Sequence, residues 1–194
     1  MPILPPEPDR HPLDLFQDDG DELARAQPQW WLMYTKSRQE KQLMRHLRRL
    51  QITHYAPQVE NRRRSPSGRI RTTYLPLFPN YVFVGGTEAD RYESICTGCI
   101  QKATAITDID MFLGDLGQIR DLIEMGVPLT VESRLQAGEH VRVKSGAFKG
   151  YEGVVVRREH ETRLLVSVRF MEQGVSVRLD DCQLEPIGVR EPSS

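Results

Sequence analysis

Short runs rich in β-branched residues, separated by single glycines, fill the last third of the sequence. From Gly138 the chain reads GEHVRVKSGAFKGYEGVVVRRE, then RLLVSVRF, then VSVRLDDCQLEP. Regularly spaced short strands with glycine turns are typical of a small β-barrel. The pattern predicts about five strands in residues 138–187, followed by a C-terminal tail at residues 188–194, and a unit of about 50 residues can fold by itself.

The region from residue 30 to residue 126 instead alternates strand and helix patterns. Strands are expected at residues 30–34, 53–59, 70–75, 80–84 and 100–106. Ser37 and Glu40 form a capping-box pattern, and Leu43, Met44, Leu47 and Leu50 follow at helical spacing. Thr87 is expected to cap a short helix that carries Tyr92, Ile95 and Cys96 on one side. A last helix is expected from about residue 110 to residue 125, with Phe112, Leu116, Ile119 and Ile123 as its apolar stripe and Gly126 as its stop. These elements predict an α+β fold, with an α/β sandwich ahead of the barrel and a linker at residues 127–137.

Charge is unevenly distributed along a chain whose formal net charge is −1. Residues 1–29 hold 7 acidic and 2 basic residues, are rich in proline and show no periodicity, so we expect a disordered acidic tail. Residues 30–75 hold 11 basic and 2 acidic residues, and this excess indicates a nearby polyanion. The alternative is a solvated helix face followed by a basic loop at residues 61–69, where Ser-Pro-Ser-Gly marks a turn.

The sequence offers little support for catalysis. Cys96 and Cys99 form a lone CxxC at the C-terminal end of an expected helix, where the helix dipole does not stabilise a thiolate, and no further ligands stand at zinc spacing. Neither a glycine-rich phosphate loop nor a nucleophile–histidine–acid set is recognisable. We therefore expect no enzymatic activity, no cofactor and no metal. Without a run of membrane length or a secretion signal, the expected location is the cytoplasm.

The stretch PLFPNYVFV, residues 76–84, gathers Phe78, Tyr81 and Phe83 in a chain with only 7% aromatic residues. Strand alternation puts Tyr81 and Phe83 on one face and the two intervening valines on the other. Two interpretations are open. The aromatic side chains fill the core, or they face outward to hold a partner while the valines fill the core.

Two parts of the chain resemble a known family. GEHVRVKSGAFKGYEGVVV is similar to the KOW motif, with Gly150 at its central glycine, and WWLMYTKSRQEK, HYAP and PLFPNYVFV look like the N-terminal (NGN) domain of NusG-type transcription elongation factors. Order, spacing and linker match this family over residues 30–187. PLFPNYVFV, with Asn80 where housekeeping NusG usually has glycine, looks closer to the RfaH-like specialised paralogues. The implied fold is an NGN domain at residues 30–126 followed by a five-stranded KOW β-barrel.

The resemblance implies a transcription elongation and antitermination factor that suppresses pausing. In the family, an apolar pocket of the NGN domain grips the clamp helices of bacterial RNA polymerase, and here that pocket would comprise Tyr34, Phe78, Tyr81 and Phe83. DNA at the upstream fork or the non-template strand would meet Lys36, Arg38, Arg45, His46, Arg49, Arg62, Arg63 and Arg64. The segment after Val84 lacks the hydroxyl-rich element with which RfaH-like proteins touch the opposite polymerase pincer.

The resemblance also implies a second partner for the KOW barrel, the ribosomal protein NusE or the termination factor Rho. Phe170 and Met171 stand where the family has its apolar contact pair, and Phe148 would border the same patch. The alternative is that Phe170 closes the end of the barrel. We expect a monomer that does not associate with membranes. Two other functions stay open: a housekeeping NusG acting genome-wide, and a KOW-type RNA-binding ribosome assembly protein.

Overall fold

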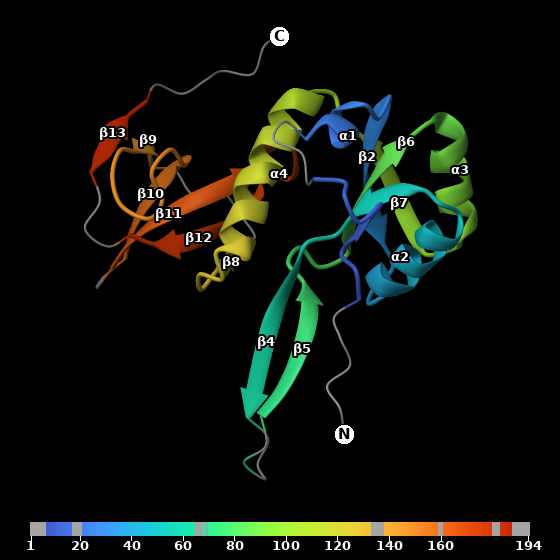
Figure 1. The fold of residues 1–194 in the computed structure, drawn as a ribbon, viewed down its shortest axis with the longest axis horizontal. Coiled ribbons are helices and arrows are strands. Elements are labelled where there is room, and N and C mark those ends of the chain that lie inside the picture. The colour runs from blue at the N-terminus through green and yellow to red at the C-terminus, as the bar shows by residue number, and fades with distance from the viewer. Residues whose placement is uncertain are drawn as a thin grey trace. The chain divides into compact units, whose positions relative to one another are not determined.

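A computed structural model describes residues 7–16, 21–64, 68, 70–132, 138–158, 161–179 and 183–187. The side chains of Arg63, Arg71, Glu132, Arg158 and Glu161 lie outside this description. The chain forms two compact units, Met1–Asp110 and Met111–Ser194. Both helices and sheets are present (Figure 1), which confirms the predicted α+β class.

The first unit is built on an antiparallel sheet. In spatial order its strands are β1 (Arg10–His11), β3 (Thr53–Tyr55), β6 (Tyr81–Gly86), β2 (Gln29–Thr35) and β7 (Ile100–Ala105). In the register of the two central strands, Tyr81 lies opposite Tyr34 and Val84 lies opposite Trp31. Alternate residues of β6 therefore face opposite sides of the sheet, as the sequence pattern predicts.

One face of this sheet packs against α2 (Glu40–Arg49). The buried cluster between them comprises Trp31, Met33, Leu43, Met44, Leu47, Ile52, Ala56, Val82, Val84 and Cys99. Both valines of β6 belong to this cluster, as one of the two interpretations requires. Next to α2, α3 (Glu88–Cys96) begins at the predicted cap, Thr87, which forms a capping box with Asp90.

The predicted capping box at the start of α2 is wrong. The helix begins at Glu40, and the N-cap residue Gln39 makes no side-chain capping bond. Arg38 turns the chain at a positive φ of 60°, which takes Ser37 out of capping position. The Glu40 carboxylate instead accepts the backbone N–H of Asn80 at 2.7 Å. Asn80 has a φ of 69°, a conformation that asparagine and glycine adopt more readily than other residues.

Strands β4 (Gln58–Arg64) and β5 (Ile70–Pro76) form a separate two-stranded sheet. This hairpin extends away from the five-stranded sheet of the first unit (Figure 1). The register runs from Gln58 opposite Pro76 to Arg64 opposite Ile70. Residues 61–64 are thus part of a strand, where the sequence pattern predicts a loop.

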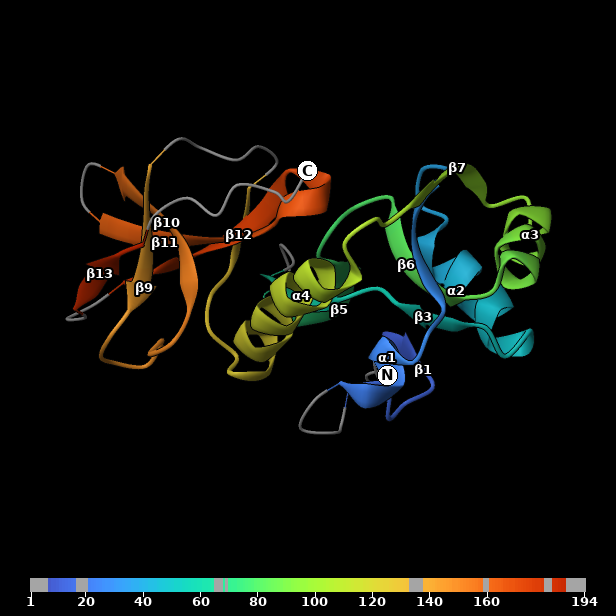
Figure 2. The ribbon, with the colours of Figure 1, turned by 90° about the horizontal axis from the view of Figure 1, so that it is seen from above.

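The N-terminal segment also differs from its prediction, which was disorder. Strand β1 pairs with β3 (Figure 2), and α1 (Glu22–Arg25) lies ahead of β2. The Phe16 ring contacts the Tyr55 ring edge-on, with ring centroids 5.0 Å apart, and the Trp30 indole N–H donates to the Ala24 carbonyl at 2.9 Å. These contacts of the Phe16 ring and the Ala24 carbonyl with aromatic side chains dock part of an acidic, proline-rich segment on the sheet.

The second unit contains the predicted barrel strands. They are β9 (Glu139–Val143), β10 (Glu152–Arg158), β11 (Glu161–Val168), β12 (Gln173–Arg178) and β13 (Leu184–Pro186). A further strand, β8 (Thr130–Glu132), pairs with β12 inside the predicted linker, so the sheet among the described residues has the order β13-β9-β10-β11-β12-β8. Gly174 on β12 is required by close packing, since a Cβ there would lie 2.4 Å from the Val166 carbonyl oxygen.

Helix α4 (Ile109–Glu124) is followed by Gly126, whose φ of 67° fits the predicted stop. Residues from Met111 onward belong to the second unit. The Gln118 side-chain oxygen, for example, accepts the Glu152 backbone N–H at 2.9 Å. Within the described ranges, none of the helices is both long enough and apolar enough to cross a membrane.

Candidate functional site

Tyr34 and Tyr81 form a partly exposed aromatic pair. They lie opposite each other on β2 and β6, and their ring centroids are 5.3 Å apart. Tyr34 is 36% exposed and Tyr81 is half-buried. Since Val82 and Val84 point toward α2, this pair belongs to the opposite face of the sheet. An aromatic body with a polar hydroxyl tip suits a protein interface.

Phe78 and Phe83 are fully buried, unlike the accessible pocket residues that the resemblance implies. Their rings meet edge-to-face with centroids 6.4 Å apart. Phe83 shares a face with Tyr81, but it lies further along the central strand, opposite Leu32 of β2 and Tyr55 of β3. Strand alternation correctly predicts that Tyr81 and Phe83 share a face. It does not predict that the residue in the middle of the strand is buried while the one at its end is accessible.

The polar face of α2 and the strand end before it carry five of the residues expected to meet DNA. Lys36, Arg38, Arg45 and Arg49 are exposed, and His46 is half-buried. The helical spacing separates them from the buried Leu43, Met44 and Leu47. Lys36 Nζ donates to the Gly98 carbonyl at 2.6 Å, so the start of this surface is tied to the end of α3. The structure therefore gathers these five residues on one helix and on the segment just before it.

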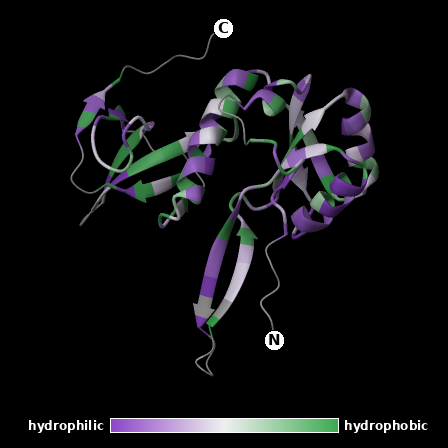
Figure 3. Cartoon of the chain, in the orientation of Figure 1, coloured by the Kyte–Doolittle hydropathy of each residue, from purple (hydrophilic) through white to green (hydrophobic). Residues whose placement is uncertain are grey.

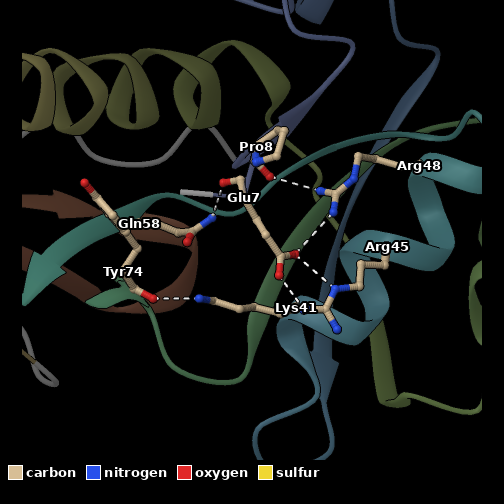
Figure 4. A network of polar contacts seen from close by, with 7 residues as sticks. All are labelled: Glu7, Pro8, Lys41, Arg45, Arg48, Gln58 and Tyr74. Carbon is tan, nitrogen blue, oxygen red and sulfur yellow. Dashed lines mark hydrogen bonds and ion pairs between the residues drawn. The ribbon is translucent and has the colours of Figure 1, made fainter. Parts of the chain in front are cut away.

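Glu7 of the acidic N-terminal segment contacts two arginines of α2 (Figure 4). Arg45 donates through Nε to Glu7 Oε2 at 3.1 Å and through Nη2 to Oε1, and Arg48 Nη2 lies 3.3 Å from Oε2. The Arg45 guanidinium, ahead of the opposing effect of burial, lowers the pKa of the Glu7 carboxyl. The only signal in the sequence was the opposite charge of residues 1–29 and 30–75.

The β4–β5 hairpin supplies the remaining predicted cations. Arg62 and Arg64 are exposed on β4, a strand that is largely hydrophilic (Figure 3). Arg62 Nε donates to the Glu60 side chain at 2.6 Å on the same strand. The side chain of Arg63, the third arginine predicted to meet DNA from this segment, lies outside the described residues.

In the second unit, Phe170 and Met171 lie in a short 3-10 helix, η1 (Arg169–Met171), between β11 and β12. Both side chains are half-buried, while Val166 and Val168 before them are fully buried. Strand alternation would point the Phe170 side chain into the barrel, but β11 ends at Val168 and Phe170 lies in η1 instead. Phe148, also half-buried, contacts the Tyr151 ring with centroids 6.1 Å apart.

Asp115 of α4 anchors this turn. Its carboxylate accepts the Arg169 backbone N–H at 3.0 Å and the Arg169 guanidinium Nη2 at 2.7 Å. The Asp115 side chain is only 5% exposed. The sequence held a signal for this contact: an acidic residue standing among Phe112, Leu116 and Ile119, the apolar stripe of the helix.

The CxxC residues are separate thiols, Cys96 exposed and Cys99 buried in the α2-side core. The Cys99 Sγ contacts the Thr97 carbonyl at 3.8 Å. In the part of the chain that the structure describes, no group of three histidine, cysteine or acidic side chains is arranged to hold a metal ion.

Two family models match the chain. The one described as "Transcription termination factor nusG" matches residues 28–134, and the KOW motif matches residues 137–169. A solved structure, "Crystal Structure of MjSpt4:Spt5 complex conformation B", is 17% identical over 83% of this chain and 99% of that chain, with a TM-score of 0.27. A TM-score this low carries no argument about the fold. The first match alone spans more than half of the 194 residues. The chain belongs to the NusG family.

Proposed function

We propose that this protein is a transcription elongation and antitermination factor that binds bacterial RNA polymerase and acts without catalysing a reaction. Family membership supports a role in transcription elongation. The observation that carries the polymerase contact is the partly exposed Tyr34–Tyr81 pair on the sheet face away from α2. The clamp helices of the polymerase are the proposed occupant of this surface, with the buried Phe78 and Phe83 supporting it from within.

The proposed mechanism is a shift between two states of the polymerase. A factor that binds the closed clamp more tightly than the open clamp favours the closed state by its difference in affinity, and by nothing else. A difference of about 1.4 kcal/mol would change the occupancy of a paused state about tenfold. Suppression of pausing therefore needs no reactive group on this chain.

DNA beside the polymerase is the proposed ligand of the α2 surface. Its exposed cations lie on the sheet side opposite the tyrosine pair, so one domain can contact protein and phosphate at the same time. Neutralised phosphates release counterions, and binding should weaken steeply as salt rises.

The KOW unit is proposed to recruit NusE or Rho through the turn at Phe170 and Met171. Half-buried apolar side chains at a strand connection support this, because such connections are usually polar. We also propose operon-specific action, as in the RfaH-like paralogues, and a cytoplasmic location. Transcript profiling with and without the protein tests operon-specific action: a specialist alters the transcripts of a few operons, whereas a housekeeping factor alters those of most.

Pulldown with purified bacterial RNA polymerase tests the polymerase contact. Tyr81→Ala should reduce binding, and Tyr92→Ala, which removes a tyrosine exposed on α3, is the matched control and should leave it unchanged. Interface aromatics commonly contribute about 2 kcal/mol or more on truncation. Failure of the unaltered protein to bind, or equal binding by both variants, would count against the proposal.

A further inference from the structure

The carboxylate of Glu7 occupies a position between two guanidinium groups on the surface proposed to meet DNA. It accepts from Nε and Nη2 of Arg45 and from Nη2 of Arg48 (Figure 4). Two arginines on successive turns of one helix face, converging on one anion, are suited to a phosphate as well as to a carboxylate, because both present oxygens that accept paired guanidinium donors.

Neighbouring contacts hold Glu7 at this position. The Pro8 carbonyl accepts from Arg48 Nη1 at 3.0 Å, and the Glu7 carbonyl accepts from Gln58 at 3.2 Å. The Ala56 backbone N–H donates to the Asp9 carbonyl at 2.7 Å, and β1 then pairs with β3. A carboxylate tethered this way has a high effective concentration at the two arginines.

The contact can nevertheless be released. The Arg45 side chain is 55% exposed, and those of Glu7 and Arg48 are 29% and 23% exposed, so water reaches all three partners. Solvent-accessible ion pairs contribute little and weaken with salt. The anchors further along the segment, such as the Phe16–Tyr55 contact, do not involve Glu7. Residue 7 can therefore leave the arginines while residues 9–16 stay docked on the sheet.

We propose that Arg45 and Arg48 form a binding position for a DNA backbone phosphate, and that Glu7 is an internal competitor for it. This inference rests on the proposed DNA contact of α2, and it adds Arg48 and the N-terminal segment to that surface. Free protein would keep its cations neutralised and would bind stray DNA weakly. On the polymerase, where DNA is held beside the factor at high local concentration, phosphate would displace the carboxylate.

Glu7→Gln tests the competition, with Asp14→Asn as its matched control. Asp14 is an exposed acid of the same segment, and its replacement changes the net charge equally without touching the arginines. Binding of the full chain to a labelled forked DNA is measured by fluorescence anisotropy over a series of salt concentrations. Glu7→Gln should bind about fivefold more tightly than the unaltered protein at low salt, and the gain should shrink as salt rises. Asp14→Asn should change the affinity less than twofold.

Arg45→Ala gives a second readout. It should weaken DNA binding more when combined with Glu7→Gln than in the unaltered protein, because the carboxylate no longer masks the arginine. Equal gains from Glu7→Gln and Asp14→Asn would overturn the competition and leave only a general charge effect. Identical affinity of Glu7→Gln and the unaltered protein would also overturn it, while the DNA surface itself would stand. If neither protein binds the DNA at any salt concentration, the DNA contact falls and the competitor falls with it.

Discussion

Asp115 and Glu7 make arginine contacts of the same chemistry in the two units of the molecule, with different degrees of burial. Asp115 is 5% exposed and binds both the backbone and the guanidinium of Arg169, whereas Glu7 is 29% exposed and binds guanidinium groups alone. Removing a partner from a buried pair is costly, while exposed pairs contribute about 0–1 kcal/mol. The first contact therefore holds the turn at η1 in place, and the second can exchange with a competing anion.

Strand β6 shows the same contrast among aromatic residues. Tyr81, its first residue, remains accessible, while Phe83, two residues further on, is enclosed. Position along one strand thus separates a side chain available to a partner from one that only stabilises the fold.

The largest expected effect is a difference in stability loss between alanine substitutions of Phe83 and Tyr81. Phe83→Ala should lower the free energy of unfolding of the first unit by about 3–5 kcal/mol, because it leaves a cavity in a packed core. Tyr81→Ala should cost about 1 kcal/mol. Urea unfolding followed by tryptophan fluorescence measures both, since Trp30 and Trp31, the two tryptophans of the chain, lie in this unit. Equal losses would show that Tyr81 is as much a core residue as Phe83.

As the pH falls, protonation of the buried His54 should lower stability before protonation of Glu7 breaks the Glu7–Arg45 contact. Burial, with smaller contributions from Arg48 and His11, lowers the pKa of His54 from 6.5 to about 4, despite the Ile52 carbonyl next to its Nδ1. The unfolded chain then binds the proton more readily, so stability present above pH 6.5 is lost as the pH falls toward 4. The loss should be about 3 kcal/mol.

Urea unfolding of the first unit at several pH values measures this loss, and His54→Leu should flatten the profile between pH 6.5 and 4. An unchanged profile would contradict the assignment. The Glu7 carboxyl has its pKa lowered below 4.5 by Arg45, so its contact persists through most of this range and is lost only at lower pH.

Asp115→Asn should destabilise the second unit by about 2–3 kcal/mol. The substitution removes the charge that Arg169 pairs with, although the half-exposed guanidinium can return to water and limits the cost. Asp121→Asn is the control, because Asp121 lies on the same helix with an exposed carboxylate beside Arg120. Amide hydrogen exchange of residues 164–168 reports on the adjacent strand. Equal protection in both variants would remove the structural role from Asp115.

Glu7→Gln should have the smallest effect on stability, less than about 1 kcal/mol, and high salt should abolish it. The same tryptophan-monitored unfolding, at low and high salt, measures it. A loss as large as that of Asp115→Asn, or one that persists in high salt, would make the Glu7 contact structural and would erase the contrast between the two carboxylates.

Local patterns in the sequence predicted much of the fold. The glycine-punctuated strands after Gly138, the Thr87 cap of α3 and the inward valines of β6 all follow from short-range periodicity or turn chemistry, which act within a few residues of the chain. The NGN–KOW order that defines the family is likewise readable along the sequence. The helix of residues 109–124 was predicted with its stop at Gly126, because its apolar stripe and its terminator are local.

Only the tertiary structure decided which residues far apart in the sequence contact each other. Glu40 leaves its predicted cap because the Asn80 amide, 40 positions away, lies within its reach. Phe83 is buried and Tyr81 accessible because Phe83 is paired with both β2 and β3, whereas Tyr81 is paired with β2 and not with β3. Composition alone did not reveal that Phe16 and Ala24 dock an acidic segment on aromatic side chains. The pairings of Glu7 with Arg45 and of Asp115 with Arg169 arise in the same way. Charge and periodicity state what each residue can do, but packing brings its partner within the few ångströms over which these contacts form.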